Sequence, residues 1–86
     1  MTAAIRPLDP GRWAVDGSAR IVDLNEALDV DLPEGDYETV AGLFLERAGR
    51  VPQPGDTIQV GNVRLEVTAA DARRIGSLVA SVVGRR

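Results

Sequence analysis

The sequence predicts an α+β fold in which two helices cover one face of a mixed, mainly antiparallel sheet. A short run near the N-terminus alternates apolar and polar residues, which is typical of a strand. Two amphipathic segments of helical period follow, and alternating runs separated by turn signals fill the second half. The expected order is therefore a strand or hairpin, two helices and three consecutive strands, or β-α-α-β-β-β.

The N-terminal part is expected to hold a leader and one early strand. Residues 1–10 form the leader, because their two prolines leave little room for regular structure. Trp13 and Val15 then share one face of a strand. Asp16-Gly17 follows, and Asp-Gly is a strong hairpin signal. We therefore expect a short return strand over residues 19–21.

Two helices are expected next. The first begins after Asp23, which is a good N-cap, and runs to Leu28. The second begins at Asp36 and ends at Gly49, a residue type typical of helix C-termini. Gly42 then lies inside the second helix, where glycine costs about 1 kcal/mol relative to alanine. Close packing of another backbone against Gly42 is the simplest compensation.

The second half is expected to form a three-stranded meander. Residues 57–60 and 63–68 read as strands joined by a two-residue turn at 61–62. The second of these strands should point Val63, Leu65 and Val67 inward. A last strand is expected from about residue 73 to residue 83, with a bulge near Gly76, where its alternation breaks. The domain thus covers residues 11–83, and residues 84–86 form a tail.

Composition excludes several kinds of chemistry. The 86 residues include no cysteine, histidine or lysine, so all ten basic residues are arginine. The chain lacks the thiolate ligand, the commonest general base and the Schiff-base nucleophile, and we expect no enzymatic activity. The net charge of −3 argues against nucleic-acid binding. No stretch approaches the roughly 20 apolar residues that span a bilayer, so no direct membrane insertion is expected.

The segment after the first helix is the best candidate for a binding site. Five carboxylates fall within residues 29–38, and hard cations such as Mg²⁺ prefer oxygen ligands of this type. The spacing does not match the EF-hand loop. In the alternative interpretation, the carboxylates nearest the second helix interact favourably with the positive N-terminal end of its dipole, and the others are solvated. The candidate metal ligands are Asp29, Asp31, Glu34 and Asp36.

Three further residues are candidates for an interaction surface. Trp13 is the chain's single tryptophan, and a partly exposed tryptophan often anchors a partner. The alternative is a core residue at the edge of the sheet. Arg73 and Arg74 could pair with an acidic partner, or they could simply keep the start of the last strand soluble.

The chain resembles the CorC/HlyC transporter-associated domain from about residue 11 to residue 78. Short motifs occur in the order typical of that family, and it is the ordered set that makes the resemblance specific. The motifs are Val15-Asp16-Gly17, Leu24-Asn25-Glu26, Tyr37-Glu38-Thr39-Val40-Ala41-Gly42-Leu43, Gly49-Arg50-Val51-Pro52, Gly55-Asp56 and Arg73-Arg74-Ile75.

The resemblance implies a regulatory accessory domain without catalytic residues. Such domains accompany CBS domains and transmembrane segments in magnesium/cobalt efflux and haemolysin-like proteins. The resemblance further implies a fold similar to the FAD-binding-like superfamily, a place on the cytoplasmic side of the cell membrane, and a homodimer as one option. Flavin binding is sometimes inferred for the family. The alternative function is a sensor that binds a divalent cation, an adenine nucleotide or FAD.

Overall fold

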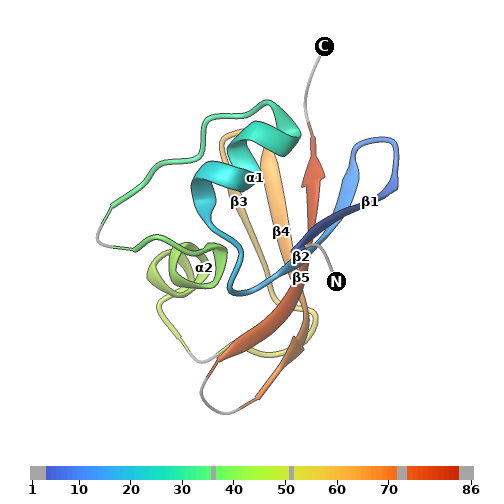
Figure 1. Ribbon diagram of the computed structural model, residues 1–86. Coiled ribbons are helices and arrows are strands. Elements are labelled where there is room, and N and C mark those ends of the chain that lie inside the picture. The colour runs from blue at the N-terminus through green and yellow to red at the C-terminus, as the bar shows by residue number, and fades with distance from the viewer. Residues whose placement is uncertain (1–3, 36, 51, 72–73, 84–86) are drawn as a thin grey trace.

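The computed structural model describes residues 4–35, 37–50, 52–71 and 74–83, which form a five-stranded sheet with two helices on one face (Figure 1). The strand order is β1-β2-β5-β4-β3, and every neighbouring pair is antiparallel. The α+β class is confirmed, but the expected mixed sheet is wrong. The elements are β1 (Ile5–Asp9), β2 (Arg12–Asp16), α1 (Ile21–Leu28), α2 (Val40–Ala48), β3 (Thr57–Val60), β4 (Val63–Ala70) and β5 (Ile75–Val82).

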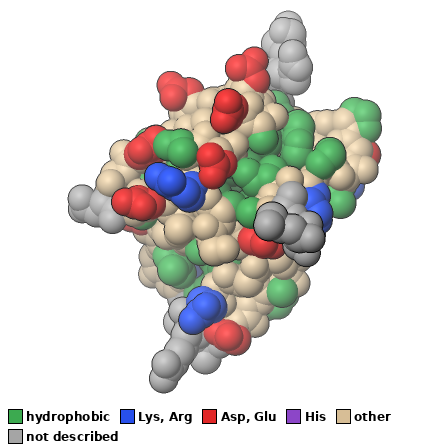
Figure 2. All heavy atoms as spheres, viewed as in Figure 1, with side chains coloured by type: hydrophobic (Ala, Val, Ile, Leu, Met, Phe, Trp, Pro, Cys, Tyr) green, Lys and Arg blue, Asp and Glu red, His purple; other side chains and the backbone are tan. Residues whose placement is uncertain are grey.

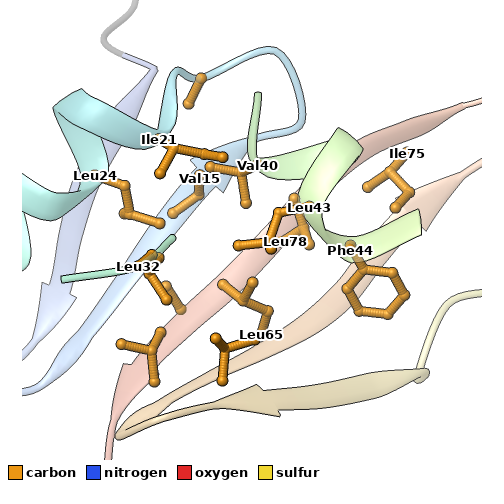
Figure 3. Close-up of a cluster of buried hydrophobic side chains, with 14 of the residues drawn as sticks. Val15, Ile21, Leu24, Leu32, Val40, Leu43, Phe44, Leu65, Ile75 and Leu78 are labelled. Atoms are coloured by element: carbon orange, nitrogen blue, oxygen red, sulfur yellow. The ribbon is translucent and has the colours of Figure 1, made fainter. Parts of the chain in front are cut away.

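The core lies between the two helices and the sheet face that they cover (Figure 3). On the sheet side, Val15 of β2 and Val67 of β4 both pair with Leu78 of β5, so the three side chains share that face. The predicted inward residues of β4 are fully buried, as the alternation indicated. The helices contribute Ile21, Leu24, Leu28, Val40, Leu43 and Phe44.

The N-terminal expectation is wrong in two respects. Residues 5–9 form the edge strand β1, which pairs with β2 through Ile5–Val15 and Pro7–Trp13. An edge strand tolerates proline, because the missing N–H can face solvent, and the register shifts after Pro7. The hairpin turn lies at Pro10-Gly11, where Gly11 has a φ of 85°, and not at Asp16-Gly17.

Gly17 lies where the backbones of β5 and α2 come close to the chain, and not in a hairpin turn. Its N–H donates to the Gly76 carbonyl of β5, and its own carbonyl accepts from Ala41 in α2. A Cβ at this position would overlap the carbonyl of Ile75. Before α1, Arg20 forms an isolated antiparallel β-bridge with Thr39. Residues 19–21 therefore do not form the expected return strand.

Both helices begin at positions other than those predicted. Helix α1 starts at Ile21, so Asp23 lies in its first turn and is not its cap. Helix α2 starts at Val40, where the Thr39 hydroxyl accepts from the Gly42 N–H at 3.1 Å. Asp36, the predicted cap, lies outside the described residues. The predicted end at Gly49 is confirmed by its left-handed φ of 69°.

Gly42 is the third residue of α2 and packs against a side chain, not a backbone. A Cβ at Gly42 would lie 2.8 Å from the Cβ of Tyr37 and 3.3 Å from the Thr39 hydroxyl. The segment before α2 can therefore fold back over the first helical turn only because Gly42 has no side chain.

The predicted bulge near Gly76 is confirmed. The register between β4 and β5 shifts twice, between Val67 and Ala69 and between Ala69 and Ala70, opposite the start of β5. Strand β5 begins at Ile75, and Arg73 lies outside the described residues.

Candidate functional site

Trp13 lies on the helix-covered face of the sheet but is only half-buried. It pairs with Ala80 of β5, and two residues further along β2, Val15 pairs with Leu78. Val15 is 1% exposed, whereas part of Trp13 remains accessible. The helical layer therefore covers Val15 completely and leaves Trp13 at its border.

An apolar area surrounds Trp13. Pro7 is its cross-strand partner, Ile5 pairs with Val15, and Val82 follows Ala80 on the same face of β5. We call Ile5, Pro7, Trp13 and Val82 the hairpin patch. Figure 2 shows hydrophobic side chains gathered between α1 and the β1–β2 hairpin, in the right half of the view.

A hollow of about 330 Å³ lies at the C-terminal end of α1. Its walls are Leu28, Val30 and Val82, and its polar groups belong to Asp29 and Asn62. We call it the α1-end hollow. Val82 belongs to both features, so the hollow and the hairpin patch adjoin at this residue.

The loop after α1 is held by a side-chain clamp. The Asn25 amide nitrogen donates to the Leu32 carbonyl at 3.1 Å, and its amide oxygen accepts from the Leu32 N–H at 2.7 Å. Leu32 is 4% exposed and anchors the loop in the core. The backbone N–H groups of Asp29 and Val30 both donate to the Asn25 carbonyl, so this loop is tied to α1 at several points.

The predicted metal ligands do not gather in the described part of the chain. The side chains of Asp29, Asp31 and Glu34 are exposed, and no cluster of three carboxylates with metal-binding geometry occurs among the described residues. Asp36, the fourth candidate, lies outside those residues. What the loop does present is exposed carboxylates that form no ion pair with another described residue.

Figure 2 shows most of the acidic side chains of the visible face in the upper left part of the view, with one arginine side chain among them. Residues 21–35 contain five carboxylates and no arginine. The four ion pairs found among the described residues lie elsewhere, for example between Arg50 and Asp56 at 3.2 Å. We call Asp23, Glu26, Asp29, Asp31 and Glu34 the acidic pole.

The remaining predicted surface residues lie apart from Trp13. The backbone of Arg74 closes the β4–β5 turn, where its N–H donates to the Asp71 carboxylate at 3.0 Å. Trp13 faces Ala80, near the other end of β5, so the structure does not bring Arg74 and Trp13 together. Arg73 lies outside the described residues.

Sequence reasoning missed Asn25 and Val82. Asparagine is a poor former of helix interiors, and its presence in the first helix was the available signal for a side-chain clamp. Val82 had no local signal, because its role arises from register alone.

The fold defines a class of small α+β domains with a five-stranded antiparallel sheet and two helices on one face. Within that class, the chain belongs to the CorC_HlyC family, the transporter associated domain, whose model matches residues 6–83.

Curated relatives are longer proteins. The magnesium and cobalt efflux protein CorC of Escherichia coli is 34% identical over 70 residues, which cover 81% of this chain and 24% of CorC. The Escherichia coli protein YegH is 33% identical over 66 residues, which cover 76% of this chain and 12% of YegH. The chain thus spans about a quarter of the length of CorC.

Solved structures share the fold. A structure described as the CorC-associated region from Neisseria meningitidis has a TM-score of 0.88 at 26% identity. The alignment covers 94% of this chain and 100% of the Neisseria chain. A domain from a Xylella fastidiosa haemolysin, solved in complex with Mg²⁺ and Mn²⁺, has a TM-score of 0.82 at 28% identity, with 95% and 100% covered. The domain of a CBS domain protein from Porphyromonas gingivalis has a TM-score of 0.79 at 29% identity, with the same coverage.

Among the described residues, neither α1 nor α2 is long and apolar enough to span a bilayer.

Proposed function

We propose that this chain is the non-catalytic regulatory domain of a magnesium/cobalt-type efflux protein. It acts on the cytoplasmic side of the membrane by docking onto the CBS-domain or transmembrane parts of the same protein. Family membership and the identity to CorC support this proposal, as does the fact that the chain corresponds to only a quarter of CorC.

The observation that carries the docking proposal is the half-buried Trp13 at the centre of the hairpin patch. Tryptophan is the residue type that most often anchors protein interfaces, because one side chain buries a large area at low entropic cost. The residues of the patch lie on paired strands, whose hydrogen bonds hold the backbone, so the patch needs little reorganisation to receive a partner.

The test is ion transport by the full-length protein. We expect Trp13→Ser to reproduce the effect of deleting the whole domain on Co²⁺ or Mg²⁺ efflux. Leu45→Ser is the matched control, because Leu45 is an exposed apolar residue (37%) on α2, outside the hairpin patch. Unchanged transport and regulation after deletion of the domain would refute the proposal.

A second candidate function is a divalent-cation sensor. The related Xylella fastidiosa domain was solved in complex with Mg²⁺ and Mn²⁺, and the acidic pole offers exposed carboxylates here. Binding of an adenine nucleotide or FAD is an alternative sensor function suggested by family resemblance. A homodimer also stays a prediction, which sedimentation of the purified chain can check.

A further inference from the structure

The α1-end hollow is lined by both apolar and polar residues. Leu28, Val30 and Val82 are the apolar ones, Asn62 is polar, and Asp29 is the charged one. Lysine and arginine side chains have the matching construction, since a long alkyl stem packs on apolar surface while the charged head stays near water or a carboxylate. A purely apolar side chain would leave the Asp29 carboxylate without a partner.

Helix α1 adds a second attraction for a cation at the same place. The helix ends at Leu28, and its last carbonyls have no partner within the helix and carry partial negative charge. No basic residue lies in the last turn of α1 to compensate this charge. The helix end and the Asp29 carboxylate therefore favour the same kind of ligand group.

The surrounding charge extends this preference over a larger surface. The acidic pole carries five of the chain's thirteen carboxylates, and none of the five forms an ion pair with another described residue. Unpaired charges of one sign accelerate encounters with partners of the opposite sign and disfavour partners of the same sign. Anionic lipid surfaces and nucleic acids are therefore poor occupants of this face.

The hairpin patch continues the hollow and needs apolar contacts. Val82 lines the hollow, and its N–H donates to the Gly11 carbonyl at the hairpin turn. Val82 thus lies beside Asp29 in the hollow and two residues beyond Ala80, the partner of Trp13, on the same face of β5. A segment that covers both the hollow and the patch must present apolar side chains to Trp13 and a cation to Asp29.

We propose that the hairpin patch and the α1-end hollow together bind a cationic amphipathic segment of a partner protein, with an arginine or lysine side chain in the hollow beside Asp29. This assignment rests on the proposed docking function and adds the chemistry of the partner. Apolar side chains of the segment pack on Trp13, Pro7 and Val82, and its basic face meets the acidic pole.

The experiment titrates the 86-residue chain with two tryptophan-free amphipathic peptides, one built of leucine and arginine and the other of leucine and glutamate. Trp13, the only tryptophan, reports binding through its fluorescence. The informative variant is Asp29→Asn. Asp29 has a φ of 56°, and asparagine tolerates this left-handed conformation, so the variant removes the charge and keeps the backbone. Glu66→Gln is the matched control, because Glu66 is exposed on the opposite face of the sheet.

The arginine peptide is expected to shift the Trp13 emission to the blue, and the glutamate peptide is expected not to bind. Asp29→Asn should weaken the affinity for the arginine peptide about fivefold, as expected for one charged contact, while Glu66→Gln leaves it unchanged. Thermal melting verifies that both variants fold.

Three results would overturn the inference. The first is equal affinity for the two peptides on the unsubstituted chain, and the second is equal affinity of Asp29→Asn and Glu66→Gln for the arginine peptide. The third is binding to phosphatidylglycerol vesicles in place of the peptide. The transport test with Trp13→Ser is independent of Asp29, so docking can stand while the cationic partner fails.

Discussion

The side-chain amide of Asn25 spans the backbone of Leu32, donating to its carbonyl at 3.1 Å and accepting from its N–H at 2.7 Å. This pair of bonds fastens the loop after α1 against the helix that precedes it. The side of the α1-end hollow that Asp29 and Val30 line depends on this arrangement, because the loop carries both residues.

Asn25→Ala is expected to destabilise the fold by about 1–3 kcal/mol, because it leaves the part-buried N–H and C=O groups of Leu32 without partners. Urea denaturation measures the change. Asn25→Asp keeps the acceptor and loses the donor, so it should fall between the unsubstituted chain and Asn25→Ala. Equal stability of all three proteins would show that the clamp contributes nothing.

Thr39→Ala should cost about 1 kcal/mol of stability, because it removes the hydroxyl that caps α2 at Gly42. Thr39→Ser retains the hydroxyl and is expected to lose little. Thr57→Ala is a control at an exposed position of β3. If Thr57→Ala proves as costly as Thr39→Ala, the effect does not come from the cap.

Gly42→Ala is expected to lower stability by about 1–3 kcal/mol, although alanine is the better helix former. The added Cβ would lie 2.8 Å from the Cβ of Tyr37. The direct test places Gly42→Ala in a Tyr37→Gly background, where the nearer obstructing atom is gone and the Thr39 hydroxyl stays at 3.3 Å. There the same substitution should cost clearly less stability, and an undiminished loss would contradict this account.

Gly17→Ala should be more damaging than Gly42→Ala, with an expected loss of about 3 kcal/mol or more. The obstructing atoms are the backbone of Ile75, which cannot rotate away as a side chain can. Circular dichroism during thermal unfolding gives the comparison. Gly11→Ala is the control for a glycine whose added Cβ meets nothing, although its positive φ carries a smaller cost of its own.

Thermal melting with Mg²⁺, Mn²⁺, ATP, AMP or FAD separates the sensor function from docking alone. A ligand at a hundredfold excess over its Kd adds about 2.7 kcal/mol of stability, which corresponds to a rise of about 10–20 °C in a domain of this size. If the acidic pole holds a cation, Asp31→Asn and Glu34→Gln should reduce that rise, and Glu46→Gln on α2 should not. The docking proposal by itself expects no shift with any of these ligands.

Local signals in the sequence determined the element types and most of the second half. The alternation of Val63, Leu65 and Val67 allows only one buried face, and the turn at residues 61–62 and the stop at Gly49 need residues of particular backbone freedom. The five carboxylates of the acidic pole and the absence of histidine, lysine and cysteine are equally plain in the sequence.

Tertiary structure decided the features whose partners are distant in the chain. Asp16-Gly17 reads locally as a hairpin, yet the glycine is needed because β5 and α2 approach it from residues 76 and 41. Strand β1 forms despite Pro7, because an edge strand pairs on one side only and the N–H that proline lacks can be one that would face solvent. Val82 lies near Trp13 because of the register of β5, and it lies near Asp29 because α1 ends beside β5. No local sequence pattern predicts this arrangement, because contact across a sheet depends on which strands pair.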